Sequence, residues 1–263
     1  MSALTTVPAA GTHRPVRTAR PSLPRLTLVE LRKAINTRAG FWLMAVIALV
    51  ALAMVVVQIF TGDAADRNFA DFFGGAQLGI GLLLPVVGIL AVTGEWSQRT
   101  TLTTFALEPR RERIVTAKLA ASAVLAAAAV AASLVWAALA NLLAPVITDA
   151  SASWEFGFEG LGRVLLFQVV NVLVGSAFGL ALLSTPLAIV LYFVLPTAWT
   201  ILGSLISALK TPAEWLDLST TTTVLLDGEL TGEAWGQLGT SLALWLALPL
   251  VLGTMRVLRS EVK

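Results

Sequence analysis

Few residues in this chain could take part in catalysis. The 263 residues include no Cys and a single His, His13, which lies in a polar N-terminal stretch. Thiolate metal ligands are therefore missing, and a serine nucleophile would have no histidine base beside it. We expect that the chain is not an enzyme, and that it holds no metal site and no cofactor of its own.

The segment of residues 94–118 is suited to a different task, which is the docking of a partner protein. Residues 100–107 can form two helical turns, and Pro109 cannot continue them but fits the first position of a new helix. One face of the two turns would be apolar, with Leu102, Phe105 and Ala106 at helical spacing. An exposed apolar face on a short helix suits insertion into a groove of a partner. A basic loop that packs against a membrane explains the same residues equally well.

The composition indicates which elements must position this segment. Apolar residues make up 57% of the chain and charged residues 13%, whereas soluble domains have roughly 45–50% and about 25%. So few charges cannot cover a water-facing surface, which excludes a soluble globular enzyme, and the apolar content excludes a disordered chain. Windows of twenty or more residues without a charge predict membrane-spanning helices instead.

The longest charge-free run, residues 164–209, decides the number of spans. As one helix it would be about 69 Å long, more than twice the ~30 Å thickness of the hydrocarbon core. We place a turn at residues 183–186, because Pro186 disfavours helical geometry in the residue before it. The predicted fold class is an all-α integral membrane protein with six transmembrane helices in one domain, residues 23–263. The predicted spans are residues 41–60, 72–93, 119–146, 164–183, 187–209 and 234–255.

The polar N-terminal part divides into two predicted segments. Residues 1–22 are rich in Pro, Thr and Arg, which is typical of a disordered tail. Residues 23–40 are expected to form an amphipathic helix in the membrane interface, because Leu28, Leu31 and Ile35 recur at helical spacing among basic residues. The alternative is a basic anchor that only sets the topology.

The distribution of charge predicts the orientation. The N-terminal part, residues 94–118 and the C-terminus hold fifteen Lys or Arg and five Asp or Glu, whereas the other connections hold three and eleven. Lys and Arg concentrate in cytoplasmic loops. We therefore expect both termini in the cytoplasm. The Ala, Gly and Arg bias is typical of a bacterial source, which makes this a multi-pass protein of the bacterial cytoplasmic membrane, in contact with the lipid bilayer and not with nucleic acid.

Polar side chains within the predicted spans are candidates for contact with a transported substrate. They are Gln77, Gln168, Asn171 and Tyr192. Hydrogen bonding between helices is the more frequent role of such amides. No Asp, Glu, Lys or Arg lies deep in a span, which argues against an ion-coupled pump. The spacings Gly75-x-x-x-Gly79 and Gly175-x-x-x-Gly179 permit close helix contacts, which we expect within one chain rather than between two copies.

The second predicted connection contains an ordered set of residues: Glu95, then Thr100 or Thr101, then Pro109-Arg110-Arg111, then Lys118. This order resembles that of the type-2 ABC exporter permeases, where a Glu at the inner end of the second span precedes a helix with Gly-Thr, then Pro-x-Arg, then a Lys that opens the third span. The chain departs from the pattern at the Gly before Thr, where Arg99 or Thr100 stands. The likeness extends to the six spans, the N-terminal amphipathic helix and the long last outer loop.

The resemblance implies a membrane-spanning permease subunit of an ATP-driven exporter, which moves a hydrophobic or amphipathic substrate outward. Two such chains, identical or paralogous, would pair with two cytoplasmic ATPase subunits that bind ATP and Mg. This chain has no G-x-x-x-x-G-K-[ST] phosphate loop of its own. The short helix after the second span would be the coupling helix, held in a groove of the ATPase. The resemblance assigns this coupling to Glu95, Arg99, Thr100, Leu102, Thr103, Phe105, Leu107, Arg110 and Arg111.

The last outer loop folds into short re-entrant helices in that family and forms an outer gate, which here would include Trp215 and Leu216. A Trp in this place is also typical of the membrane interface. The alternative function is a non-transporting membrane scaffold or assembly protein that docks a soluble partner through residues 94–118. An intramembrane enzyme is disfavoured, because the spans hold no carboxylate and no His.

Overall fold

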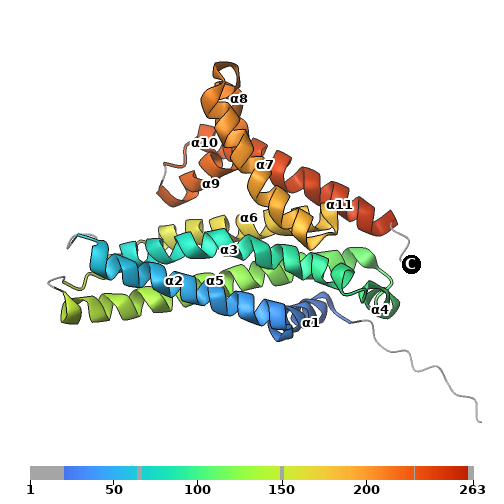
Figure 1. The fold of residues 1–263 in the computed structure, drawn as a ribbon, viewed down its shortest axis with the longest axis horizontal. Helices are drawn as coiled ribbons and strands as arrows, with labels where there is room; N and C mark the ends of the chain where they lie inside the picture. The colour runs from blue at the N-terminus through green and yellow to red at the C-terminus, as the bar shows by residue number, and fades with distance from the viewer. Residues whose placement is uncertain (1–20, 64–66, 149–150, 228, 260–263) are drawn as a thin grey trace, which may run out of the picture.

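The computed structural model describes residues 21–63, 67–148, 151–227 and 229–259, and every element in these ranges is a helix (Figure 1). Residues 1–20 of the predicted disordered tail lie outside the described residues. The elements are α1 (Leu23–Asn36), α2 (Arg38–Thr61), α3 (Phe69–Ser97), α4 (Thr101–Leu107), α5 (Arg111–Ile147), α6 (Phe158–Leu182), α7 (Thr185–Leu205), η2 (Ser207–Leu209), α8 (Lys210–Leu216), α9 (Leu218–Asp227), α10 (Gly232–Leu242), η3 (Ala243–Ala247) and α11 (Leu248–Arg259).

Six helices in the described part of the chain are long and apolar enough to cross a membrane. They are α2, α3, α5, α6 from Gly160, α7, and the continuous helix Gly232–Arg259 that joins α10, η3 and α11. Each contains most of one predicted span. The fifth span, α7, ends at Leu205 rather than at residue 209, because Ile206 takes an extended conformation and the short helix η2 follows.

The predicted turn between the fourth and fifth spans is confirmed. Leu183 ends α6 in a left-handed conformation with φ of 52°, and α7 begins at Thr185. Pro186 lies in the first turn of α7, where its missing N–H would have no helical partner in any case.

The sixth span contains one wide turn. Residues Ala243–Ala247 form a π-helix between α10 and α11. Pro249 follows at once, and a proline ring collides with the carbonyl group four residues earlier, here that of Trp245. A π turn widens the helix at that point and moves this carbonyl group away.

Glycines bring α3 into close contact with its neighbours. A Cβ at Gly175 of α6 would collide with the Pro85 backbone of α3, and one at Gly79 of α3 would meet Val50 of α2 at 2.8 Å. Gly88 faces the Val172 carbonyl group in the same way. The two G-x-x-x-G spacings therefore serve helix contacts within the chain, as predicted.

The predicted amphipathic helix at residues 23–40 is shorter than expected. It ends at Asn36, because Thr37 is extended and its hydroxyl caps α2 by accepting from the Gly40 N–H at 3.1 Å. The predicted apolar face is also divided. Leu31 packs against the core, while Leu28 and Ile35 are exposed.

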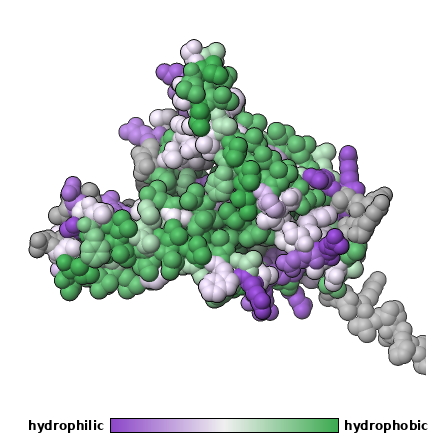
Figure 2. Space-filling view, in the orientation of Figure 1, coloured by the Kyte–Doolittle hydropathy of each residue, from purple (hydrophilic) through white to green (hydrophobic). Residues whose placement is uncertain are grey.

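The polar and apolar surfaces are separated along the molecule. Figure 2 shows a largely apolar surface over the middle of the helices, with hydrophilic residues gathered towards their ends. In Figure 1, α1, α4 and the end of α11 lie at one end of the bundle, and the end of α5 lies at the other. The same view shows α7 inclined away from α2, α3 and α5, with α8 beyond its far end.

Candidate functional site

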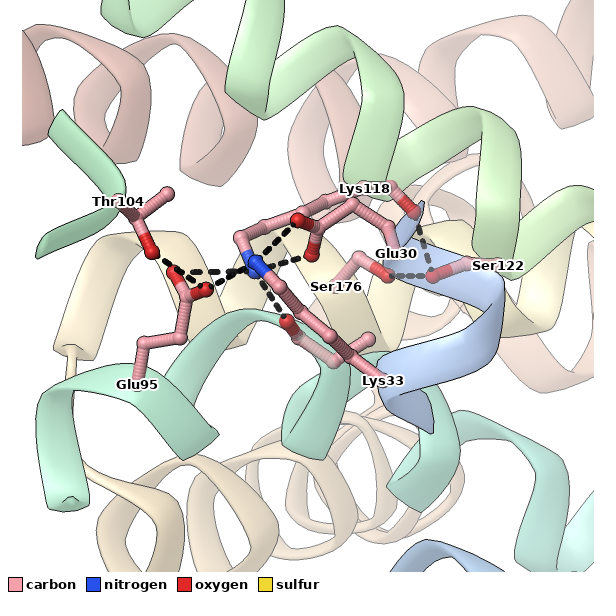
Figure 3. Close-up of polar contacts among 8 residues, drawn as sticks. Glu30, Lys33, Glu95, Thr104, Lys118, Ser122 and Ser176 are labelled. Carbon is pink, nitrogen blue, oxygen red and sulfur yellow. Dashed lines mark hydrogen bonds and ion pairs between the residues drawn. The ribbon is translucent and has the colours of Figure 1, made fainter. Parts of the chain in front are cut away.

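Four charged side chains form a compact group where α1, α3 and α5 meet. We call Glu30, Lys33, Glu95 and Lys118 the charge cluster. Figure 3 shows Lys118 between the two carboxylates, with its Nζ 2.7 Å from Glu30 Oε2 and 3.2 Å from Glu95 Oε2. Lys33 Nζ lies 2.7 Å from an oxygen of each carboxylate. Each base therefore contacts both acids, and the cluster has no net formal charge.

Local sequence accounts for this meeting of charges. Glu30 and Lys33 stand three residues apart on α1, so both project from the same face. Glu95 comes from the last turn of α3, and Lys118 lies two turns inside α5. The Lys118 ammonium also donates to the Ala91 carbonyl group of α3 at 3.0 Å. The cluster thus joins three helices that are distant in sequence.

The interactions in the cluster hold Lys33 in its charged form. Burial of Lys33 acts to lower its pKa, but hydrogen bonds and charge from Glu30 and Glu95 outweigh burial and raise the pKa above its ordinary value of 10.5. The stabilising effect of this base is therefore complete below its unfolded pKa, and it is lost only as the pH rises through the raised value. Lys118 is more deeply enclosed, with 7% of its side chain exposed.

The short helix α4 is attached to the cluster. The Thr104 hydroxyl donates to Glu95 Oε1 at 2.9 Å (Figure 3). Residues 100–107 were expected to contain a helix of two turns, and α4 occupies Thr101–Leu107. A movement of α4 would therefore act directly on the carboxylate that ends α3.

A second contact joins α4 to the end of the sixth span. The Phe105 ring packs edge-on against Trp96 of α3, and the Arg111 guanidinium lies 4.6 Å from the centre of the Phe105 ring. Arg111 also donates from Nη1 to the carbonyl groups of Val257 at 2.8 Å and Leu258 at 3.4 Å. These carbonyl groups belong to the last turn of α11, where the intrahelical partners are missing.

The face that α4 leaves open differs from the predicted one. Leu102 and Leu107 are exposed to 53% and 80%, and Thr103 and Ala106 are exposed beside them. Phe105 was expected on the same apolar face but is half-buried against Trp96 and Arg111. The surface available to a partner therefore consists of Leu102, Thr103, Ala106 and Leu107.

Arg99 occupies a strained position between α3 and α4. Its φ is 56°, in the left-handed region that favours glycine. Its N–H bonds to the Trp96 carbonyl group, and the Thr100 N–H bonds to that of Glu95, which is the Schellman ending of a helix. Glycine stands before threonine in the pattern that this segment resembles, so the departure at Arg99 falls on the residue whose backbone most favours glycine.

We expect Arg99→Gly to stabilise the protein by about 0.5–1 kcal/mol, since glycine adopts this conformation without a Cβ conflict. The measurement is the thermal unfolding midpoint in detergent. Arg110→Gly is the matched control, because Arg110 has an ordinary φ of −84°. A lower midpoint for Arg99→Gly than for the unchanged protein would contradict the expectation.

The other predicted residues of this segment, Thr100 and Arg110, are exposed at the two ends of α4. Thr100 precedes α4 without a side-chain cap bond, and Arg110 is exposed. Pro109 does not open the next helix as predicted, because Arg110 is the N-cap and α5 begins at Arg111. Arg113 joins this connection to Glu108 at 2.8 Å and to the Pro21 carbonyl group at 2.6 Å.

Sequence reasoning missed Glu30, Lys33 and Arg113 as parts of the site, and it saw Lys118 only as the start of a span. One signal was present. Glu30 is the single acidic residue among the first forty, and it stands three residues before Lys33. That arrangement indicates an ion pair on one helix face, but it does not show that Glu95 and Lys118 complete it.

Three of the four polar residues predicted for a substrate pathway line one cavity of about 710 Å³ between α3, α6, α7 and α9: Gln77, Asn171 and Tyr192. Gln168 is fully buried beside it and donates to Gln77 Oε1 at 2.9 Å, so it joins two helices instead. The Tyr192 hydroxyl donates to Asn171 Oδ1 at 3.3 Å. Gln168 and Asn171 stand three residues apart on α6, but of the two only Asn171 lines the cavity.

The predicted outer gate residues lie at the end of α8, which with α9 forms two short helices in the last connection. The Leu216 carbonyl group accepts from the Trp245 indole at 2.7 Å, and that of Trp215 accepts from the Thr240 hydroxyl at 2.8 Å. The backbones of Trp215 and Leu216 are therefore fastened to the sixth span. The Trp215 ring is partly exposed.

The sequence matches no family model and no curated protein.

Proposed function

We propose that this chain is the membrane-spanning subunit of an ATP-driven exporter, and that α4 receives the force from a separate cytoplasmic ATPase. The observation that carries the proposal is that the two faces of α4 have different contacts. Its outer face offers Leu102 and Leu107 to a partner, while its inner face is held by Glu95 and Arg111. A helix used only for docking would need the outer face alone.

The inner contacts support transmission rather than simple attachment. Thr104 links α4 to Glu95, and through the charge cluster to α1 and α5. Phe105 and Arg111 link α4 to the end of α11. A displacement of α4 would thus act directly on α3 and α5, and through Glu95 and Arg111 it would reach α1 and α11. Such contacts are what a coupling element requires.

The remaining parts of the proposal follow from the same assignment. Two copies of this chain, or this chain and a paralogue, would assemble with two ATPase subunits that hold ATP and Mg. The membrane would be the bacterial cytoplasmic membrane, with both termini in the cytoplasm. The cavity lined by Gln77, Asn171 and Tyr192 supports a route for a hydrophobic or amphipathic substrate, which would move outward.

The test is to purify the full-length protein from its native membrane and to measure ATP hydrolysis in the eluate. We expect an ATPase to co-purify, and we expect Leu102→Ser combined with Leu107→Ser to remove at least nine-tenths of it, since a helix bound in a groove is held by its apolar anchors. Leu205→Ser is the matched control, because Leu205 is equally exposed at the far end of α7.

Three results would count against the proposal. An ATPase that stays bound to the Leu102→Ser, Leu107→Ser variant would show that α4 is not the docking element. A partner that is lost with these residues but hydrolyses no ATP would support the scaffold or assembly function instead. Equal loss in the Leu205→Ser control would show a general effect on assembly.

A further inference from the structure

The cavity between α3, α6, α7 and α9 is lined by one acidic side chain and by no basic one among the residues that the structure describes. This acidic residue is Asp71. Asp71 stands in the first turn of α3, and its side chain is exposed. The single formal charge among these lining residues is therefore negative, and it would attract a cation and repel an anion.

Three of the hydroxyl groups of the wall, those of Tyr192, Thr222 and Thr223, can act only as hydrogen-bond acceptors towards a ligand. Thr222 and Thr223 donate to the carbonyl groups of Leu218 and Ser219 in their own helix, at 2.6 Å and 3.1 Å. The Tyr192 hydroxyl donates to Asn171. A hydroxyl has one hydrogen and two lone pairs, so these three groups have only lone pairs left for a ligand.

Aromatic rings supply the rest of the wall. Phe73, Phe156, Phe167 and Phe193 all line the cavity. The faces of aromatic rings carry partial negative charge and attract organic cations, while the same rings bury apolar groups well. Acceptors, ring faces and one carboxylate all favour the same kind of ligand.

We propose that this cavity binds an organic cation with an apolar body, and that it discriminates against anions of the same size. The proposal rests on the proposed function only in naming this ligand as the substrate of export. Binding itself belongs to this chain alone, so it is measurable without an ATPase.

The experiment uses two probes of the same four-phenyl shape and opposite charge, tetraphenylphosphonium and tetraphenylborate. Full-length protein in phosphatidylcholine nanodiscs is dialysed against each ion, and uptake by empty nanodiscs is subtracted. We expect a saturable excess of the cation on the protein and no saturable excess of the anion.

Two pairs of variants locate the binding. Asp71→Asn should weaken binding of the cation about threefold, as expected for a partly exposed ion pair, whereas Asp63→Asn removes an exposed carboxylate outside the cavity and should change nothing. Gly74→Trp should abolish binding, because Gly74 lines the cavity with open space before its Cβ position. Gly239→Trp adds the same side chain at an open position elsewhere and should have no effect.

Equal saturable binding of both ions would overturn the proposal, and so would cation binding that survives Gly74→Trp. Loss of binding in the Gly239→Trp control would also overturn the assignment to this cavity. The Leu102→Ser, Leu107→Ser variant should bind the cation normally. Cation binding without an ATPase partner would retain this inference and reject the exporter, whereas a coupled ATPase without cation binding would do the reverse.

Discussion

Replacing Lys118 by Met is expected to lower the free energy of unfolding by about 3–5 kcal/mol, the cost of leaving a buried charge without its partner. The ammonium of Lys118 contacts both Glu30 and Glu95 in a place with little access to water. After the substitution, the two carboxylates would share Lys33 alone, and Lys33 is partly exposed. The measurement is the unfolding midpoint of the purified protein in detergent.

A double substitution separates loss of charge balance from loss of packing. Lys118→Met with Glu30→Gln leaves one acid and one base, Glu95 and Lys33, so this double variant should be more stable than Lys118→Met alone. Lys210→Met is the control, because Lys210 is exposed on α8 and far from the cluster in sequence. The ionic explanation is wrong if the double variant is the less stable of the two.

Replacing Arg111 by Ala should disconnect α4 from α11. The change removes the cation–π contact with Phe105 and the bonds to the Val257 and Leu258 carbonyl groups. Charged hydrogen bonds of this kind contribute about 1.5–3 kcal/mol and a cation–π contact about 0.5–1 kcal/mol. Because Arg111 is only half-buried, we expect stability to fall by about 1–3 kcal/mol.

The same change should be visible as a wider distribution of distances between the two helices. The chain has no Cys, so Thr103→Cys and Arg259→Cys introduce two unique positions for spin labels on α4 and α11. Electron–electron distance measurements should give one narrow peak in the unchanged background and a broad one with Arg111→Ala. Arg110→Ala, at the exposed neighbour, should leave the peak narrow.

A comparison of activity distinguishes transmission from stability. In the proposed complex with an ATPase, Arg111→Ala should retain ATP hydrolysis while export per ATP falls about tenfold, the effect of some 1.4 kcal/mol of lost coupling. Arg111→Lys keeps the charge but loses the planar stacking on Phe105. Its export per ATP should lie between that of the unchanged protein and that of Arg111→Ala. Unchanged export per ATP would limit Arg111 to a structural role.

The number and order of the membrane-spanning helices could be predicted because they depend on local properties. Charge-free runs of sufficient length mark the spans, and Pro186 marks the turn within residues 164–209. Which apolar residues of α1 contact the core could not be predicted from such local properties. Leu28 and Leu31 stand three residues apart, so both belong to the predicted apolar face, and only the packing of the whole bundle makes Leu31 the one that contacts the core.

The candidate site was predictable in part for a related reason. Residues 94–118 stand out in charge and in turn signals, so the short helix was found within one residue of its observed bounds. Phe105 packs against Arg111, and Arg111 is itself held by the Val257 carbonyl group, 146 residues later in the chain. The pairing of Glu30 with Lys118 spans 88 residues. Such contacts leave no trace in the local pattern.

The charge cluster also imposes an order on biosynthesis. Its members are made in sequence, with Glu30 and Lys33 first, Glu95 much later and Lys118 last. A nascent chain that ends before residue 118 has two acids for one base, and its α1 lacks the ammonium that secures Glu30 to α5. The amphipathic helix at the N-terminus can reach its final partners only after the third span has begun to emerge. Early insertion therefore proceeds before α1 is joined to α5, and a chain released before this point would carry an incomplete cluster with one net negative charge.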